Sequence, residues 1–188
     1  MILTMDPPTP HLTTRARLVA AAREEFVGHG FAGTDSNKIA RRAGFAPQTF
    51  YRWFKDKTDI FLAVYGGWQR EDGVTIGRLI GQRATGAMLA EALIGHHRLY
   101  RTFRRGLKTL ALDDGRVREA RATWRRRQIA QIAHWSAPRP APSPEAITVR
   151  LLELERLADA VAEGEFTDMG LGEDQARARL AEIFDELR

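Results

Sequence analysis

The feature that most constrains the fold is a series of three short helical patterns near the N-terminus, separated by closely spaced glycines. The first pattern runs from about Arg15 to His29, with apolar residues on one face, and Gly30 follows its end. The second runs from Asp35 or Ser36, either of which can cap a helix, to Ala43. Gly44 supplies a turn, and a third helix is predicted over Pro47–Phe54, since proline is tolerated in a first helical turn.

The third helix belongs to the segment GFAPQTFYRWFKDK, residues 44–57, which carries more charges than a core helix and more rings than a solvated one. The spacing of Phe50 and Phe54 places them on one face, where they can anchor the helix to the two before it. Gln48 and Arg52 then project elsewhere. A short helix, a glycine turn and a second helix with a polar outer face are typical of the helix-turn-helix, whose second helix enters the major groove of DNA.

Residues 21–65 resemble the DNA-binding domain of TetR-type transcriptional regulators. The similarity lies in Phe-x-x-x-Gly-Phe at the end of the first helix, Ile-Ala-x-x-Ala-Gly in the second, Thr-Phe-Tyr-x-x-Phe in the third and Lys-x-Lys before a fourth. The resemblance implies an all-α fold of about nine helices. It also implies a sequence-specific transcriptional regulator, a repressor that a small molecule releases from a palindromic operator.

The resemblance also implies roles for individual residues. Gln48 and Thr49 would approach base edges, and Tyr51 and Lys57 would bind phosphates. Their chemistry agrees, because a glutamine amide can pair with adenine and a threonine methyl can touch thymine. Arg52 can pair with guanine or grip the backbone. The full set of expected DNA-binding residues is Thr34, Ser36, Lys38, Gln48, Thr49, Tyr51, Arg52, Trp53, Lys55 and Lys57.

Two positions depart from the family pattern. Asp35 stands where a threonine that caps the second helix and contacts phosphate is frequent, so we expect it to keep the cap and to repel DNA unless it points away. Ser36 replaces a common valine, which loosens the core and can pass the phosphate contact to Ser36 or Thr34. Trp53 is expected to have a packing or phosphate role.

Composition restricts the class of protein. The 188 residues contain no cysteine, which excludes a disulfide framework, a thiolate nucleophile and a cysteine zinc site. The formal net charge of +5 indicates a polyanionic partner, although residues 145–188 are predominantly acidic. Residues 1–12 contain three prolines and no basic run, so we expect a disordered arm and not a signal peptide. No apolar run is long enough to span a membrane, and a cytoplasmic location is expected.

The expected domains are a helix-turn-helix domain at residues 13–72 and a helical effector-binding and dimerisation domain at residues 73–188. A fourth helix from Thr58 would connect them. It carries glycines at 73, 77 and 81, each of which costs a helix about 1 kcal/mol relative to alanine. Close packing of another backbone is the favoured explanation, and a hinge or a break in the helix is the alternative.

The resemblance implies an effector pocket within the second domain, but the effector itself cannot be identified from the sequence. Candidate lining residues are Trp68, His96, Tyr100, Phe103, Trp124 and Trp135. Two basic stretches, residues 101–108 and 125–127, can admit an anionic effector such as an acyl thioester. The preferred interpretation is that they are solvated or paired with the acidic C-terminal helices.

The last two amphipathic helices are where this family pairs its subunits, so a homodimer is expected. A two-fold dimer would also read a palindrome, which a single short helix cannot do with useful specificity. The expected interface residues are Leu151, Leu154, Ala158, Val161, Leu180, Ile183, Phe184 and Leu187.

Catalysis, cofactors and metals are not expected. The chain has no glycine-rich phosphate loop, no nucleophile elbow and no His-Glu-x-x-His pair, and the adjacent His96 and His97 point about 100° apart on a helix. Two other functions remain open beside the ligand-released repressor. One is a DNA-binding dimer without a small-molecule effector, and the other is a helical protein that uses its basic patches to bind acidic partner proteins.

Overall fold

The computed structural model describes residues 13–135 and 142–187, and within them the chain forms ten α-helices and no strand. The all-α prediction is therefore confirmed. The chain packs as two compact units, Met1–Val64 and Tyr65–Arg188. The expected arm at residues 1–12 lies outside the described residues, and the functional boundary after residue 72 stays a prediction. None of the described helices is both long and apolar enough to cross a lipid bilayer.

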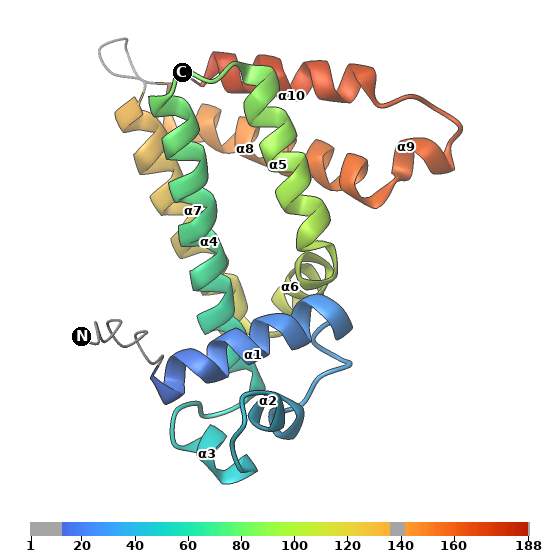
Figure 1. The fold of residues 1–188 in the computed structure, drawn as a ribbon. Coiled ribbons are helices and arrows are strands. Elements are labelled where there is room, and N and C mark those ends of the chain that lie inside the picture. The colour runs from blue at the N-terminus through green and yellow to red at the C-terminus, as the bar shows by residue number, and fades with distance from the viewer. Residues whose placement is uncertain (1–12, 136–141, 188) are drawn as a thin grey trace, which may run out of the picture. The chain divides into compact units, whose positions relative to one another are not determined.

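The first unit contains the three helices that the glycine spacing predicts. Helix α1 spans Thr14–His29, α2 spans Ser36–Arg42 and α3 spans Pro47–Tyr51 (Figure 1). The hydroxyl of Thr13 caps α1 by accepting from the amide of Ala16, at 3.2 Å. Gly44 lies between α2 and α3 with φ of 77°, a backbone conformation that favours glycine.

Helix α3 is shorter than the sequence predicts. It ends at Tyr51, and the chain continues through a turn in which the amides of Trp53 and Phe54 both donate to the carbonyl of Phe50, at 3.0 Å. Phe54 still lies against the core, so the anchoring by Phe50 and Phe54 does not need a longer helix. The core of the unit is otherwise built from Leu18, Ala22, Phe26, Ile39, Ala40, Ile60 and Phe61.

Helix α4 spans Lys57–Gly81 without a break, and its residues contribute to both units. The expected close packing at the glycines is wrong for Gly77 and Gly81, because a Cβ at either position would meet no atom within 4 Å. At Gly73 it would meet only a side-chain oxygen of Gln131, at 3.9 Å. These glycines therefore lower helix propensity without allowing a close helix contact.

The second unit contains the remaining helices. After α4 come α5 (Gly86–Leu99), α6 (Arg101–Asp113), α7 (Gly115–Trp135), α8 (Pro144–Glu163), the short α9 (Glu165–Asp168) and α10 (Asp174–Glu186). Helices α8 and α10 lie beside each other, and α5 packs against both (Figure 1). Their apolar faces meet in one core, which includes Leu89, Ile94, Ile147, Leu154 and Leu180.

A glycine permits the closest of these helix contacts. Gly86 begins α5 directly after Thr85, whose hydroxyl caps the helix through the amide of Met88. A Cβ at Gly86 would lie 2.3 Å from the carbonyl oxygen of Ala181 on α10. The approach of α5 to α10 therefore depends on the absence of a side chain at this position.

Candidate nucleic-acid interface and internal cavity

The inner side of α3 is fixed by two rings. Phe50 and Phe54 are buried, and their ring centroids are 5.7 Å apart. The guanidinium of Arg15 on α1 lies over the Phe54 ring, 5.2 Å from its centroid. The sequence-based expectation that Phe50 and Phe54 anchor the helix is confirmed, and α3 is thereby held with its opposite side outward.

The outer side of α3 and its following turn carry side chains suited to DNA. Gln48 and Arg52 are exposed and Thr49 is half-buried, and none of the three side chains hydrogen-bonds to a described residue. Trp53 and Lys55 are also exposed. Amide, hydroxyl and guanidinium groups that are not used within the fold can bind base edges and phosphates.

Tyr51 links the outer side of α3 to the start of α2. Its ring is 60% exposed, and its hydroxyl lies 2.9 Å from the hydroxyl of Ser36. One hydroxyl donates its proton to the other, so the hydroxyl that accepts keeps an O–H with which to bind a phosphate oxygen. Ser36 and Tyr51, each predicted separately as a DNA contact, are thus brought together at one exposed place.

Helix α2 begins with the cap that the sequence predicts. The carboxylate of Asp35 accepts from the amide of Lys38 at 2.8 Å, and this backbone hydrogen bond lowers the pKa of Asp35. Lys38 is exposed and its ammonium donates to the carbonyl of Gly33, at 2.9 Å. Asp35 is also exposed, so its negative charge lies in solvent beside Lys38.

Thr34 corrects the predicted set of DNA contacts. Its side chain is only 2% exposed, and its hydroxyl donates to the carbonyl of Glu25 on α1, at 3.3 Å. A buried hydroxyl with a backbone partner stabilises the link between α1 and α2 and does not reach a ligand. Threonine was selected from the sequence because its hydroxyl can bind phosphate, but its burial could not be read from composition.

Lys57 has a structural role at the start of α4. Its ammonium donates to the carbonyls of Phe31 and Thr34, at 2.8 and 2.9 Å, and lies 4.0 Å from the centroid of the Phe31 ring. Partial burial lowers its pKa. Two of its three N–H groups are used within the fold, so the phosphate role stays a prediction that depends on the third.

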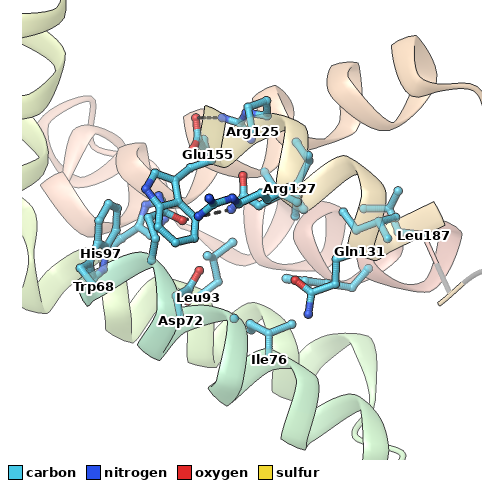
Figure 2. Close-up of a pocket in the computed structure, with 18 of the residues that line it drawn as sticks. Trp68, Asp72, Ile76, Leu93, His97, Arg125, Arg127, Gln131, Glu155 and Leu187 are labelled. Atoms are coloured by element: carbon cyan, nitrogen blue, oxygen red, sulfur yellow. Dashed lines mark hydrogen bonds and ion pairs between the residues drawn. The ribbon is translucent and has the colours of Figure 1, made fainter. Parts of the chain in front are cut away.

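The second unit contains a cavity with a volume of about 140 Å³ between α4, α5, α7, α8 and α10. Trp68, Asp72 and Ile76 come from α4, and Arg125, Arg127 and Gln131 come from α7 (Figure 2). One part of the wall is apolar, with Ile80, Leu93, Ile132, Leu151, Leu154, Phe184 and Leu187. The remainder carries charged groups and amides, so the cavity wall is chemically mixed.

One polar group of side chains begins at Trp68. The indole N–H of Trp68 donates to the imidazole of His96, and Nδ1 of His96 lies 3.2 Å from a carboxylate oxygen of Asp72. An imidazole that accepts at Nε2 and donates from Nδ1 satisfies both contacts. The orientation of Trp68 at the cavity wall is thereby fixed.

A second group is centred on the buried carboxylate of Asp159 on α8. It accepts from His97 at 2.8 Å, from Arg104 at 2.7 and 3.1 Å, and lies 2.6 Å from the ammonium of Lys108. Burial alone would raise the pKa of Asp159, but these donors outweigh burial and lower it. Burial lowers the pKa of His97. The pairing of basic residues with acidic C-terminal helices, expected from the sequence, is confirmed here.

Arg125 occupies the wall of the cavity on α7. Its Nη2 pairs with a carboxylate oxygen of Glu155 on α8, at 2.6 Å. Its Nη1 is buried and has no hydrogen-bond acceptor among the described residues. A buried N–H without an acceptor is unfavourable by about 1–3 kcal/mol, so this atom marks a position where a bound acceptor would be stabilised.

Only some of the residues predicted to line an effector pocket line the cavity. Trp68 and Trp124 line the cavity. His96, Tyr100 and Phe103 do not line it, and each packs its ring against Trp68, at centroid distances of 5.3, 5.7 and 5.9 Å. The side chain of Trp135 lies outside the described residues.

Sequence reasoning missed Asp72, Gln128 and Glu155 as cavity residues. A signal was present, since Asp72 lies one helical turn from both Trp68 and Ile76 on α4 and so interrupts an apolar stripe. A charged residue within such a stripe is seldom buried unless it has a partner. Of the residues predicted instead, His96, Tyr100 and Phe103 belong to the packing around Trp68.

The residues expected at a dimer interface form part of the core of a single chain. All of them are buried within this chain: Leu151, Leu154, Ala158, Val161, Leu180, Ile183, Phe184 and Leu187. Helix periodicity marks a face that is covered, but it does not say whether the same chain or a partner covers it. The use of these stripes as evidence for a subunit contact is therefore corrected. Two apolar residues on the other side of α8, Val149 and Leu152, are 61% and 53% exposed.

The described residues contain no cluster of three or more histidine and acidic side chains that could hold a metal ion. The two sites with recognisable chemistry are therefore the outer side of α3, with its polar groups, and the cavity of the second unit.

Comparison with known proteins gives a match for the N-terminal region. Residues 18–64 match the family model described as bacterial regulatory proteins, tetR family. No curated protein matches the sequence.

Solved structures match the chain over nearly its whole length. A protein from Rhodococcus sp. described as a TetR-family transcriptional regulator is 17% identical, with a TM-score of 0.70, covering 93% of this chain and 97% of its own. A transcriptional regulator from Saccharomonospora viridis in complex with choline is 17% identical, with a TM-score of 0.67 and coverages of 91% and 95%. The fatty acid degradation regulator FadR from Bacillus halodurans is 16% identical, with a TM-score of 0.58 and coverages of 95% and 96%. At these identities the matches show a shared fold.

Proposed function

The N-terminal domain of this chain, residues 18–64, belongs to the tetR family of bacterial regulatory proteins, and we propose that the whole protein is a repressor that a small molecule releases from a palindromic operator. The family match of residues 18–64 and the shared fold support a DNA-binding transcriptional regulator.

One observation carries the proposal. Phe50 and Phe54 hold α3 from inside, while Gln48, Thr49 and Arg52 lie outside with no hydrogen bond to a described residue. An amide, a hydroxyl and a guanidinium presented together on the helix that follows α2 through a glycine turn are the groups that a reading helix uses. The proposed division of roles is that Gln48 and Thr49 contact bases, while Tyr51 with Ser36 contacts phosphates.

The protein is proposed to act as a homodimer, since two reading helices related by a two-fold axis recognise the two halves of a palindrome. The exposed face of α8 that carries Val149 and Leu152 supports a contact through this helix. The proposed contact differs from the buried stripes, because it uses residues that the core of one chain leaves exposed.

Ligand control is proposed from the cavity in the second unit. Its volume of about 140 Å³ and its mixture of apolar and charged walls are suited to a small molecule. One structure of the same fold contains choline and another belongs to a regulator of fatty acid degradation, which supports a small-molecule effector here as well.

Selection from a randomised DNA duplex pool at about 0.15 M salt, close to physiological ionic strength, tests the proposal. Recovery of one palindrome is expected. Tyr51→Ala should abolish its binding, and Gln48→Ala should change the preference at one base position in each half.

Two variants with the same charge change separate sequence-specific DNA recognition from non-specific electrostatic attraction to DNA. Arg52→Gln should lower operator affinity at least tenfold, whereas Arg126→Gln should leave it unchanged, since Arg126 is an exposed residue of α7 that pairs with Glu119. Equal losses in both, with no consensus recovered, would show that the basic surface binds DNA without sequence preference and would refute the proposal.

A further inference from the structure

The cavity adjoins a second one, and the two share part of their walls. The first will be called the apolar chamber, after Ile76, Ile80, Leu93, Ile132 and Phe184. The second, with a volume of about 180 Å³, will be called the basic chamber, after Arg104, Lys108, Arg121 and Arg125. Trp68, Gln69, Arg104, Arg125, Gln128 and Glu155 line both. A molecule with one apolar and one polar end could therefore occupy both chambers.

The charge of the basic chamber favours an anion. Four cationic side chains line it, and Glu155 is its one acidic lining residue within the described part of the chain. Asp159 neutralises part of this charge through Arg104 and Lys108, and Glu155 pairs with Arg125. Arg121 makes no ion pair with any described residue, so a positive charge remains for a ligand.

Arg125 lines both chambers and has an unpartnered atom. Its Nη1 is buried without an acceptor among the described residues. A carboxylate accepts hydrogen bonds through both oxygens and can bind a guanidinium while carrying its own charge. A carboxylate bound beside Arg125 would therefore supply the acceptor that Nη1 lacks.

The aromatic walls are less suited to a cationic ligand. A quaternary ammonium binds over the face of a tryptophan. Here the guanidinium of Arg104 already lies over Trp68, 5.4 Å from its centroid, and that of Arg127 lies over Trp124, at 4.6 Å. A cationic ligand would have to displace or approach these charges.

The size of the apolar chamber limits the length of a bound aliphatic chain. A cavity of about 150 Å³ holds a benzene ring, so the 140 Å³ chamber has room for about six carbons. With the head group and its first carbons in the basic chamber, a straight chain of about eight to ten carbons fits the two chambers together.

We propose that this site binds a medium-chain aliphatic carboxylate, with its tail in the apolar chamber and its carboxylate at Arg125 and Arg121 in the basic chamber. The inference rests on the proposed function only in taking this ligand as the effector, because binding itself does not require DNA. Asp72 and Glu155 are acidic members of the apolar chamber wall, and both have partners, His96 and Arg125.

Isothermal titration calorimetry of the free protein tests the proposal with four probes: octanoate, octan-1-ol, octylammonium and choline. Octanoate should bind at least tenfold more tightly than each of the others, since only octanoate has both the tail and the negative charge. Among straight-chain carboxylates from four to sixteen carbons, affinity should be highest at about eight to ten, matching the two chambers together. Equal or tighter binding of octylammonium or choline would overturn the proposal, and so would the absence of octanoate binding.

Variants locate the carboxylate. Arg121→Gln should weaken octanoate binding at least fivefold and leave octan-1-ol binding unchanged, and Arg125→Gln should weaken it further. Arg126→Gln, the neighbouring exposed arginine that lines neither chamber, is the matched control and should have no effect. Arg121 has no ion pair to lose, so its variant remains informative if Arg125→Gln unfolds the protein. Unchanged octanoate affinity in Arg121→Gln would overturn the assignment.

Operator binding, measured separately, distinguishes this inference from the proposed function. Octanoate binding by a protein that selects no DNA sequence would support the ligand site and refute the regulator. Sequence-specific DNA binding by a protein that binds no octanoate would support the regulator and refute the ligand site.

Discussion

Replacing Asp159 with alanine should remove the central acceptor of the buried network in the second unit. The carboxylate is 5% exposed and contacts Arg104, His97 and Lys108. Without it, the guanidinium of Arg104, which is 7% exposed, would remain buried without its counter-charge. Removing one partner of a buried ion pair destabilises a protein by about 3–5 kcal/mol, so we expect a loss of that size in the free energy of unfolding.

Urea unfolding followed by circular dichroism measures this loss. With a slope of about 2 kcal/mol per molar urea, the midpoint should fall by about 2 M. Two controls separate burial from charge. Lys108→Gln removes a partner that is 46% exposed, and Glu163→Gln removes the 3.4 Å pair with exposed Arg105. Glu163→Gln should cost less than about 1 kcal/mol, as exposed pairs do. Lys108→Gln should cost less than Asp159→Ala, because the buried carboxylate keeps His97 and Arg104 as donors.

A loss below about 1 kcal/mol in Asp159→Ala would refute the reasoning, because Arg104 would then be stable without a buried counter-charge. The pH dependence provides a second check. The donors lower the pKa of Asp159 in the folded chain below the ordinary value of about 3.9, so its contribution is complete above that pH. It is lost as the pH falls further and the folded carboxylate takes up a proton. In Asp159→Asn this component of acid sensitivity should be absent.

Three further predictions concern single positions. Gly86→Ala should destabilise the second unit by about 1–3 kcal/mol through overlap with the Ala181 carbonyl, whereas Gly77→Ala should stabilise it by about 0.5–1 kcal/mol, since nothing lies within 4 Å. Equal urea midpoints for the two would contradict the close α5–α10 contact. Asp35→Asn should keep the α2 cap and the melting temperature but raise affinity for duplex DNA at low salt, and a weaker mobility shift would disprove repulsion by Asp35. Burial lowers the pKa of His97, so the free energy of unfolding should fall as the pH drops below about 6.5, and an unchanged pH profile in His97→Gln would assign that slope to other groups.

Local sequence patterns were sufficient to predict the helices, caps and turns of most of the first unit. The capping residues Thr13 and Asp35 and the turn glycine Gly44 act on backbone atoms within a few residues, so their roles follow from neighbouring sequence. The inward faces of Phe50 and Phe54 follow from helix geometry in the same way. The length of α3 did not follow, because it ends in a turn whose hydrogen bonds converge on one carbonyl.

Long-range packing decided which polar residues are buried and which helix covers each apolar stripe. The sequence predicts Thr34 as a phosphate ligand, but its side chain is buried and donates to the carbonyl of Glu25. The stripe that includes Leu154 and Leu180 would look the same against a partner subunit, and only the fold shows that α5 covers it. Such outcomes depend on residues far away in the chain.

The sequence by itself determined the first four helices, their order and the helix-turn-helix, because helix caps, turns and periodicity are local and 3.6-residue spacing is visible in any window. Only the tertiary structure decided which helix faces meet. Arg125 and Trp68 are 57 positions apart, yet the packing of α7 against its neighbours brings both to one cavity wall. Helix packing also creates the cavity, buries the unpartnered guanidinium nitrogen of Arg125 and surrounds the carboxylate of Asp159 with donors. Burial is a property of the assembled helices and not of any one of them.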